Sequence, residues 1–183
     1  MKVRERHKDF IGTEIIKVIN VKIRIYRKTD RKGVSHLIEE MKDAMIAFDR
    51  HGEYDRKKGF GEASLKDMLK GVSQKKGILY VAEDKGKIIG YVVGTLPVLP
   101  SKTDLLGLKE PLIKIGEVDE VYVEPNFRRS NVGVKLMGKV EAWLREHGCT
   151  VIMVGFFTEN KRALSFYNKI GYKVVGANAV KEI

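Results

Sequence analysis

The sequence predicts a single mixed α/β domain, in which amphipathic helices alternate with the strands of one sheet. Its 183 residues are enough for one well-buried core. A composition of 43% hydrophobic and 32% charged residues is typical of a globular chain. Strand and helix periodicities follow one another in the order strand, two helices, three strands, helix, strand, helix, strand.

The N-terminal third predicts one strand and two helices. Residues 21–28 alternate apolar and polar side chains, which indicates a half-buried strand. Apolar residues then recur at three- and four-residue steps over 34–48, as one face of a helix requires. Residues 50–62 are polar and contain glycine, so we expect a loop there. Ser64, with Asp67 three residues later, predicts the capped start of the second helix.

The middle of the chain predicts a hairpin, a long loop and a strand. Two apolar runs within 77–96 flank the turn residues 84–86, which is typical of a hairpin. Three prolines within 97–113 exclude a central strand, and long loops in compact domains are usually functional flaps. Residues 114–124 predict the next strand, which Pro125 ends.

The C-terminal part predicts two more helices and two more strands. A helical apolar stripe covers 132–147, and 150–157 have the continuous apolarity of a buried strand. The last helix is expected to begin at Asn160 as its N-cap and to end at Gly171. Residues 172–180 predict a closing strand.

Positive charge is concentrated at the N-terminus. Residues 1–28 hold nine Lys or Arg against three Asp or Glu, so they carry +6 of the net charge of +11. We therefore predict a basic N-terminal extension over 1–20, followed by one domain over 21–183. The extension is interpreted as a solvated or oligomer-contacting segment, with a nucleic-acid arm as the alternative. No aromatic interleaving accompanies the charge, so nucleic acid is not the expected partner.

Other function classes are disfavoured by what the sequence lacks. No segment reaches the roughly 18 apolar residues of a membrane span, and residues 1–10 lack the apolar stretch of a signal peptide, so a cytoplasmic protein without a membrane partner is expected. The single cysteine, Cys149, cannot form an internal disulfide. The four histidines lack metal-ligand spacing, and no metal is predicted.

The segment "RRSNVGV" (128–134) indicates an anion site, because it lies between a strand and a helix. A helix N-terminus offers unpaired amides and the positive end of the backbone dipole, which suit a phosphate. Arg128 and Arg129 add permanent charge, and Gly133 lets the backbone approach the anion. The segment has neither the Gly-Lys-Ser/Thr of a P-loop nor the spaced glycines of a dinucleotide fingerprint.

A second motif, "NKRALSFYNKIGY" (160–172), is not dictated by helix packing alone. Together with "VYVEPNFRRSNVGVKLM" (121–137), it resembles the GNAT superfamily of acyl-CoA-dependent N-acetyltransferases, over roughly residues 21–180. The resemblance implies a mixed, mostly antiparallel central sheet with helices on both faces.

The resemblance also implies acetyl-CoA as co-substrate and a set of residues that hold it. The amides from Arg129 to Val134 would surround the pyrophosphate, and the strand at 121–123 would pair its backbone with the pantetheine arm after splaying from its neighbour. Asn160 would contact the coenzyme from the other side, and Tyr167 would stand beside the sulfur. The expected coenzyme-binding residues are Val121, Tyr122, Val123, Arg128, Arg129, Ser130, Asn131, Val132, Gly133, Val134, Asn160, Ala163 and Tyr167.

Asn131 departs from the family motif, which has glycine at that position. Asparagine is the commonest non-glycine residue at positive φ, so the backbone turn is expected to survive. Its side chain could still crowd the phosphates. This departure supports the alternative of a non-catalytic acyl-CoA-binding or regulatory domain.

Acetyl transfer to an amine requires a base, because an alkyl ammonium with a pKa near ~10.4 is no nucleophile. Strict two-residue alternation in "GEVDEVYV" predicts Glu117, Asp119 and Val121 on one face of the strand, with Glu120 and Tyr122 on the other. Glu117 matches the place where some family members carry their catalytic glutamate, and Asp119 and Glu120 are the alternatives.

The resemblance further implies that Tyr167 protonates the leaving thiolate and that the amide of Val121 stabilises the oxyanion. The expected function is an N-acetyltransferase that acts by direct attack of a primary amine in a ternary complex. The acceptor stays open among protein lysine, a protein N-terminus, a polyamine and a small amine such as an aminoglycoside. Homodimerisation is also left open.

Overall fold

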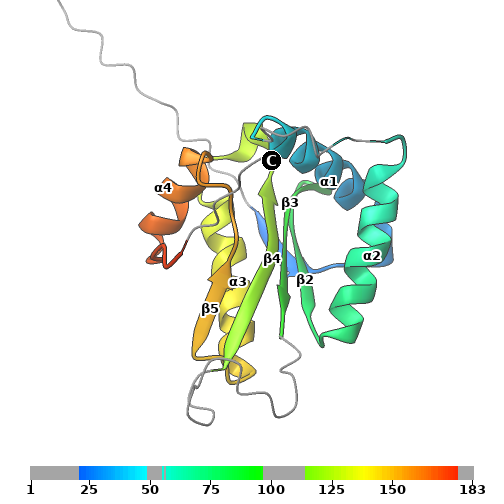
Figure 1. Cartoon of the computed structure of the whole chain (residues 1–183). Coiled ribbons are helices and arrows are strands. Elements are labelled where there is room, and N and C mark those ends of the chain that lie inside the picture. The colour runs from blue at the N-terminus through cyan, green and yellow to red at the C-terminus, as the bar shows by residue number, and fades with distance from the viewer. Residues whose placement is uncertain (1–20, 49–54, 56, 97–113, 177–183) are drawn as a thin grey trace, which may run out of the picture.

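The structure, a computed structural model, describes residues 21–48, 55, 57–96 and 114–176. Figure 1 shows one twisted sheet with helices packed against both of its faces. The predicted extension (1–20) and the predicted flap (97–113) lie outside the described residues. The elements are β1 (Lys22–Ile25), η1 (Lys28–Asp30), α1 (Arg31–Ile46), α2 (Phe60–Gln74), β2 (Ile78–Asp84), β3 (Lys87–Thr95), β4 (Ile115–Val123), η2 (Pro125–Phe127), α3 (Val132–Glu146), β5 (Val151–Val154) and α4 (Lys161–Lys169).

The five described strands lie in the order β1-β2-β3-β4-β5. Neighbours from β1 to β4 are antiparallel, and only β4 and β5 are parallel. The parallel pair follows from α3, which crosses over between the two strands. The prediction of a mixed, mostly antiparallel sheet with helices on both faces is confirmed.

Each face of the sheet carries its own core. Val34, Leu37 and Ile38 of α1 pack with α2 against one face, where Tyr91 is fully buried. On the other face, α3 packs a stripe that includes Leu136 against the sheet. The sheet is therefore covered on both sides, and the residues that alternate along β3 belong to different cores.

The start of α2 differs from the prediction. The helix begins at Phe60 instead of at the Ser64 cap, so the end of the predicted loop is helical. Gly59 precedes it with φ of +80°, a conformation that glycine adopts at little cost. Gly61 then lies so close to α1 that a Cβ there would come within 2.2 Å of the Ser35 carbonyl oxygen. Contact between the two helices, which local capping signals do not reveal, decides this boundary.

The predicted closing strand is wrong over its described part. Residues 172–176 pair with no other described strand, and 177–180 lie outside the described residues. Tyr172 packs against the core, but Val174 and Val175 are 55% and 92% exposed. An apolar run forms a strand only where a neighbouring strand takes up its hydrogen bonds, and no strand within the described residues does so for 172–176.

Candidate functional site

A β-bulge in β4 brings three carboxylates together. Val93 pairs with Glu120 while Gly94 pairs with Val118, so Asp119 is an extra residue between two matched pairs. Beyond the bulge Thr95 pairs with Glu117. Directly opposed residues share a face, and Val93 and Thr95 belong to the α1/α2 side of β3. Glu117 and Glu120 therefore share the α1/α2 face.

The bulge overturns the predicted alternation of β4. Glu117 was expected to share a face with Val121, but Val121 and Val118 both pack into the α3 core, and Glu117 lies on the opposite face. The extra residue reverses the phase of the strand below it, so two-residue counting fails across it. Gly94, opposite the bulge, was the available signal, because a glycine inside a strand often marks one.

Each carboxylate has a different partner on this acidic face, which we define as Glu117, Asp119 and Glu120. The Tyr91 hydroxyl donates to Oε2 of Glu120 over 2.8 Å. Thr95 donates from Oγ1 to Oδ1 of Asp119 over 3.1 Å. Glu117 forms an ion pair from the C-terminal end of α2, where Nζ of Lys75 lies 3.7 Å from Oε2.

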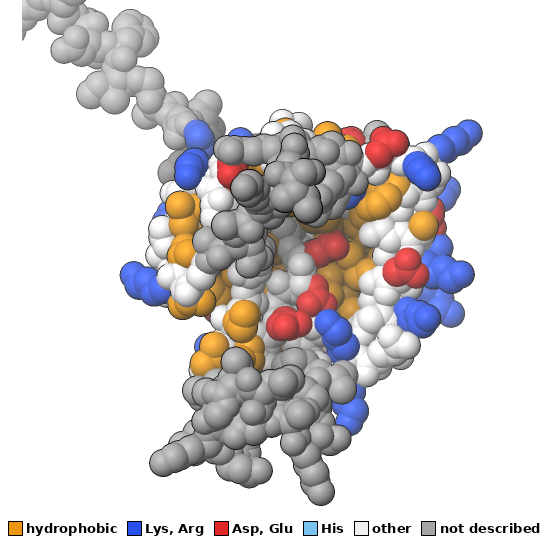
Figure 2. All heavy atoms as spheres, in the orientation of Figure 1, with side chains coloured by type: hydrophobic (Ala, Val, Ile, Leu, Met, Phe, Trp, Pro, Cys, Tyr) orange, Lys and Arg blue, Asp and Glu red, His pale blue; other side chains and the backbone are white. Residues whose placement is uncertain are grey.

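Figure 2 shows acidic side chains gathered in a hollow beside β4, with α2 on its far side and basic side chains at its rim. Desolvation by burial raises the pKa of Glu120, against the hydrogen bond from Tyr91, which lowers it. The pKa of Asp119 is also raised, chiefly by desolvation, although this side chain stays solvent-exposed. A face of three carboxylates and one lysine attracts a cation.

β4 and β5 part directly beside the acidic face. Their parallel pairing runs from Ile115 and Val151 to Val118 and Val154, where it stops. β4 continues to Val123 with β3 alone as its described partner. The upper half of β4 therefore presents one edge of backbone groups to the gap, as the predicted splay requires. The carbonyl of Val123 is already taken, since it accepts a 2.9 Å hydrogen bond from Nε of Arg128.

The anion segment ends in a tight turn at the start of α3. Arg129 and Asn131 both have φ of +62°, so the predicted positive φ of Asn131 is confirmed. Asn131 is the N-cap residue, yet its side chain makes no capping hydrogen bond. The first amides of a helix have no intrahelical partner. Those of Val132, Gly133 and Val134 therefore remain available for a ligand.

The other polar residues of the segment brace it. The guanidinium of Arg128 lies 5.3 Å from the centre of the Tyr122 ring, which adds a cation–π contact to its bond with Val123. Ser130 donates from Oγ to the Phe127 carbonyl over 2.5 Å. These contacts fix the segment between β4 and α3, and Arg129 is left exposed.

A side chain at position 133 would crowd Phe166 of α4. A Cβ there would lie 3.2 Å from Cζ of Phe166, closer than an ordinary contact. The ring of Phe166 thus brings α4 against the first turn of α3. The sequence could not reveal this contact, because it joins residues 33 positions apart.

α4 places the remaining predicted residues. Asn160 caps the helix through Oδ1, which accepts from the amide of Ala163 over 3.0 Å, as predicted. Tyr167 is 6% exposed and lies among the rings of Phe156, Phe166 and Tyr172 at centroid distances of 5.3, 5.4 and 5.7 Å. Burial raises the pKa of Tyr167 to about 12, so its hydroxyl keeps its proton at neutral pH.

The predicted residues thus occupy two regions, which meet where β4 and β5 part. β4 and β5 both run toward the end of the molecule where α4 lies (Figure 1). Sequence reasoning missed Lys75, Thr95 and Tyr91, which hold the three carboxylates. No local pattern marks them, since they reach β4 only through the folded sheet and α2.

Neither a metal centre nor a membrane-spanning helix is found among the described residues. No group of three or more His, Cys, Asp and Glu side chains within them could hold a metal ion. Among the described helices, none combines the length and apolarity that crossing a bilayer requires.

The sequence matches the profile of the acetyltransferase (GNAT) family over residues 35–172, three quarters of the chain. The chain belongs to this family. The matched residues include both sequence motifs (121–137 and 160–172) and the whole of β4, so the predicted family is confirmed.

Two proteins named as N-acetyltransferases are similar to this chain over part of their length. An uncharacterised N-acetyltransferase of Methanocaldococcus jannaschii is 23% identical over 153 residues, which cover 84% of this chain and 62% of that protein. A thialysine N-ε-acetyltransferase of Bos taurus is 30% identical over 54 residues, 30% of this chain and 32% of that enzyme. The chain thus spans less than two thirds of either relative's length.

Solved structures share the GNAT fold. A mutant protein of Bacillus halodurans superposes with a TM-score of 0.73 at 19% identity, covering 88% of this chain and 99% of that one. The aminoglycoside N-acetyltransferase AAC(6')-Iy, in complex with CoA, gives a TM-score of 0.65 at 15% identity, covering 90% and 95%. At such identities the likeness establishes the fold.

Proposed function

We propose that this GNAT protein transfers an acetyl group from acetyl-CoA to a primary amine, which attacks directly in a ternary complex. The observation that carries the proposal is the junction of three features at one place: β4 parted from β5, the uncapped first turn of α3, and the acidic face. The first two suit the pantetheine and pyrophosphate of a coenzyme, and the third suits an amine.

The residues present fit the coenzyme. The amides from Arg129 to Val134 would hold the pyrophosphate, because the N-cap side chain of Asn131 does not occupy them. The backbone of Val121, Tyr122 and Val123 would align the pantetheine arm along β4. Bound acetyl-CoA would supply an activated thioester and a thiol leaving group. Ser130, Asn160 and Ala163 would complete the walls of the site from the two helix N-termini.

The acidic face would receive the acceptor. An amine is a cation at neutral pH, and three carboxylates favour its approach. We assign Glu117 as the base that removes the ammonium proton, with Asp119 and Glu120 as alternatives. This assignment is supported by the bulge, which brings the three carboxylates to the α1/α2 face, and by the ion pair between Glu117 and Lys75 at the end of α2.

Tyr167 would act as the acid. Its buried hydroxyl remains protonated at neutral pH, so it could donate its proton to the sulfur as the C–S bond breaks, after which solvent would reprotonate the tyrosinate. The amide of Val121, next to the parted strands, would stabilise negative charge on the carbonyl oxygen.

Two measurements test the proposal with the purified full chain. Calorimetry with acetyl-CoA should show saturable binding, and a thiol reagent should detect free CoA when a panel of amines is added. The panel should contain a polyamine, an aminoglycoside, a lysine peptide and a free protein N-terminus. Binding without thiol release for any amine would point to a non-catalytic acyl-CoA-binding domain. No binding at low millimolar ligand would refute the proposal.

A further inference from the structure

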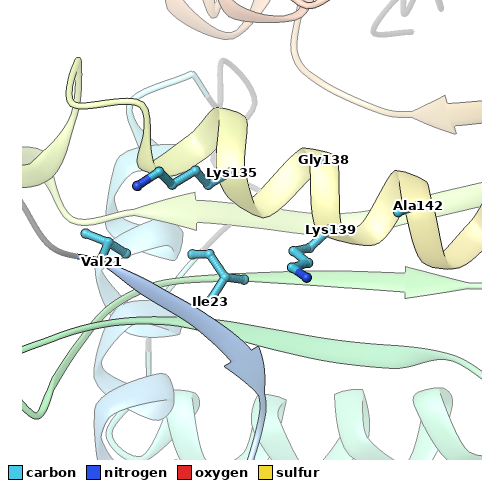
Figure 3. Close-up of a pocket in the computed structure, with 6 residues that line it drawn as sticks. All are labelled: Val21, Ile23, Lys135, Gly138, Lys139 and Ala142. Carbon is cyan, nitrogen blue, oxygen red and sulfur yellow. The ribbon is translucent and has the colours of Figure 1, made fainter.

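A groove of about 420 Å³ separates β1 from α3, on the opposite face of the sheet from the acidic face. It is lined by Val21, Ile23, Lys135, Gly138, Lys139 and Ala142. In Figure 3 the side chains of Val21 and Ile23 point from β1 toward α3, and both lysines extend from α3 over the same space.

The groove has an apolar floor and a basic rim. Val21 and Ile23 belong to or pack on the core beneath α3, so the floor is the outer surface of that core. Lys135 and Lys139, one helical turn apart, are exposed. Within the part of the chain that the structure describes, neither lysine has an ion-pair partner. The surface therefore suits a segment that is both apolar and acidic.

One stretch of this chain has that composition and begins close to the groove. Residues 9–16, "DFIGTEII", hold four large apolar side chains and two acids, with no Lys or Arg. The remainder of residues 1–20 holds five Lys or Arg and one Glu. Only residues 17–20 separate this stretch from Val21, which itself lines the groove. Four residues are enough to reverse the chain direction.

We infer that residues 9–16 dock in this groove of their own chain, with Asp9 and Glu14 near Lys135 and Lys139. The short tether gives the segment an effective concentration in the millimolar range, so weak apolar and ionic contacts suffice. Docking would cover the apolar floor of the groove and hold β1 against α3. The first turn of α3 contains the end of the anion segment. The inference does not depend on the proposed acetyl transfer.

Hydrogen–deuterium exchange on the full chain, without any ligand, tests the inference. Amides of residues 10–16 should exchange at least tenfold more slowly than in a synthetic peptide of residues 1–20. Ile15→Asp should abolish the protection. Val3→Asp, which adds the same charge outside the docking stretch, should leave it intact. Equal exchange in the chain and the peptide would refute the inference.

A disulfide between two introduced cysteines tests whether the segment in the groove comes from the same chain. A Cβ at Gly138 meets nothing within 4 Å, so Gly138→Cys has room, and it can be combined with Ile15→Cys. Under mild oxidation we expect an intramolecular bond whose yield does not change on tenfold dilution. Covalent dimers that disappear on dilution would show that a second copy occupies the groove, which overturns the assignment. No bond under oxidation would overturn it as well.

Discussion

Tyr91 of β3 and Glu120 of β4 form a hydrogen bond across the sheet, in which the hydroxyl donates to Oε2 over 2.8 Å. Tyr91 is fully buried beneath α1, and burial raises the pKa of both groups. The acidic face therefore contains one carboxyl anchored in the core, while Glu117 and Asp119 lie nearer to solvent.

Glu120→Gln should stabilise the protein at pH 8 but not at pH 4. A carboxyl whose pKa is raised by folding ionises more readily in the unfolded chain, so its ionisation lowers stability as pH rises from about 4.3 through the folded-state pKa. Glutamine removes that cost and can still accept from Tyr91. Thermal unfolding at both pH values measures the effect, with Asp67→Asn on α2 as control. If the variant and the wild type differed in stability by the same amount at pH 4 and pH 8, ionisation of Glu120 would not be the cause.

Glu117→Gln should lower kcat by about 10²-fold or more at pH 7, if Glu117 is the base. The loss should shrink as the pH approaches the pKa of the amine, near ~10.4, because the acceptor then deprotonates by itself. Rate–pH profiles of wild type and variant measure this. If Asp119→Asn or Glu120→Gln reproduces that profile instead, the base lies at that position.

Lys75→Gln should lower the KM for a cationic acceptor by several-fold and leave kcat nearly unchanged. Lys75 competes with the incoming ammonium for Glu117, and an exposed ion pair of this kind is worth up to about 1 kcal/mol. Lys70→Gln, an exposed lysine of the same helix, is the matched control. Steady-state kinetics with a neutral amine should show no such gain, and a gain there would argue against electrostatic competition.

Tyr167→Phe should lower kcat at least tenfold while acetyl-CoA binding persists. The substitution removes only the hydroxyl and keeps the ring among its aromatic neighbours. Tyr172→Phe is the control, because it removes a hydroxyl from a neighbouring ring. That hydroxyl donates a hydrogen bond to Oε1 of Glu141 over 3.0 Å. Steady-state kinetics measures kcat, and calorimetry measures the affinity for acetyl-CoA. Full turnover in Tyr167→Phe would reduce Tyr167 to a packing role.

Gly133→Ala should weaken acetyl-CoA binding, because the added methyl group would lie 3.2 Å from Cζ of Phe166 and displace the first turn of α3 from α4. Phe166→Leu in the same chain should recover part of the loss by making room. Calorimetry measures both effects. An unaltered affinity would show that the anion segment does not depend on the contact between α3 and α4.

The sequence predicted those parts of the fold that depend on local pattern. The hairpin of β2 and β3, the apolar stripe of α3 and the Asn160 cap follow from turn chemistry, periodicity and capping, and the structure confirms them. The predicted start of α2 was wrong because contact with Ser35 decides it, and the predicted strand was wrong over 172–176 because no described strand pairs with these residues.

The half of the candidate site that local sequence could predict is the anion segment. The turn at Asn131 follows from residue type, since positive φ favours asparagine, and the structure has it. The other half, the acidic face, depends on the bulge at Asp119, which changes which side chains share a face. Lys75 joins this half only because α2 ends beside β4.

Asp119 also sets the phase of β4, with a consequence for any shortened version of this chain. Removing that one residue would leave Glu120 and Val118 consecutive opposite Val93 and Gly94, so Val118 and Glu117 would keep their partners and their faces. A deletion of a single codon would therefore be expected to straighten the strand and keep both cores, at the cost of the Asp119 carboxylate and its hydrogen bond from Thr95.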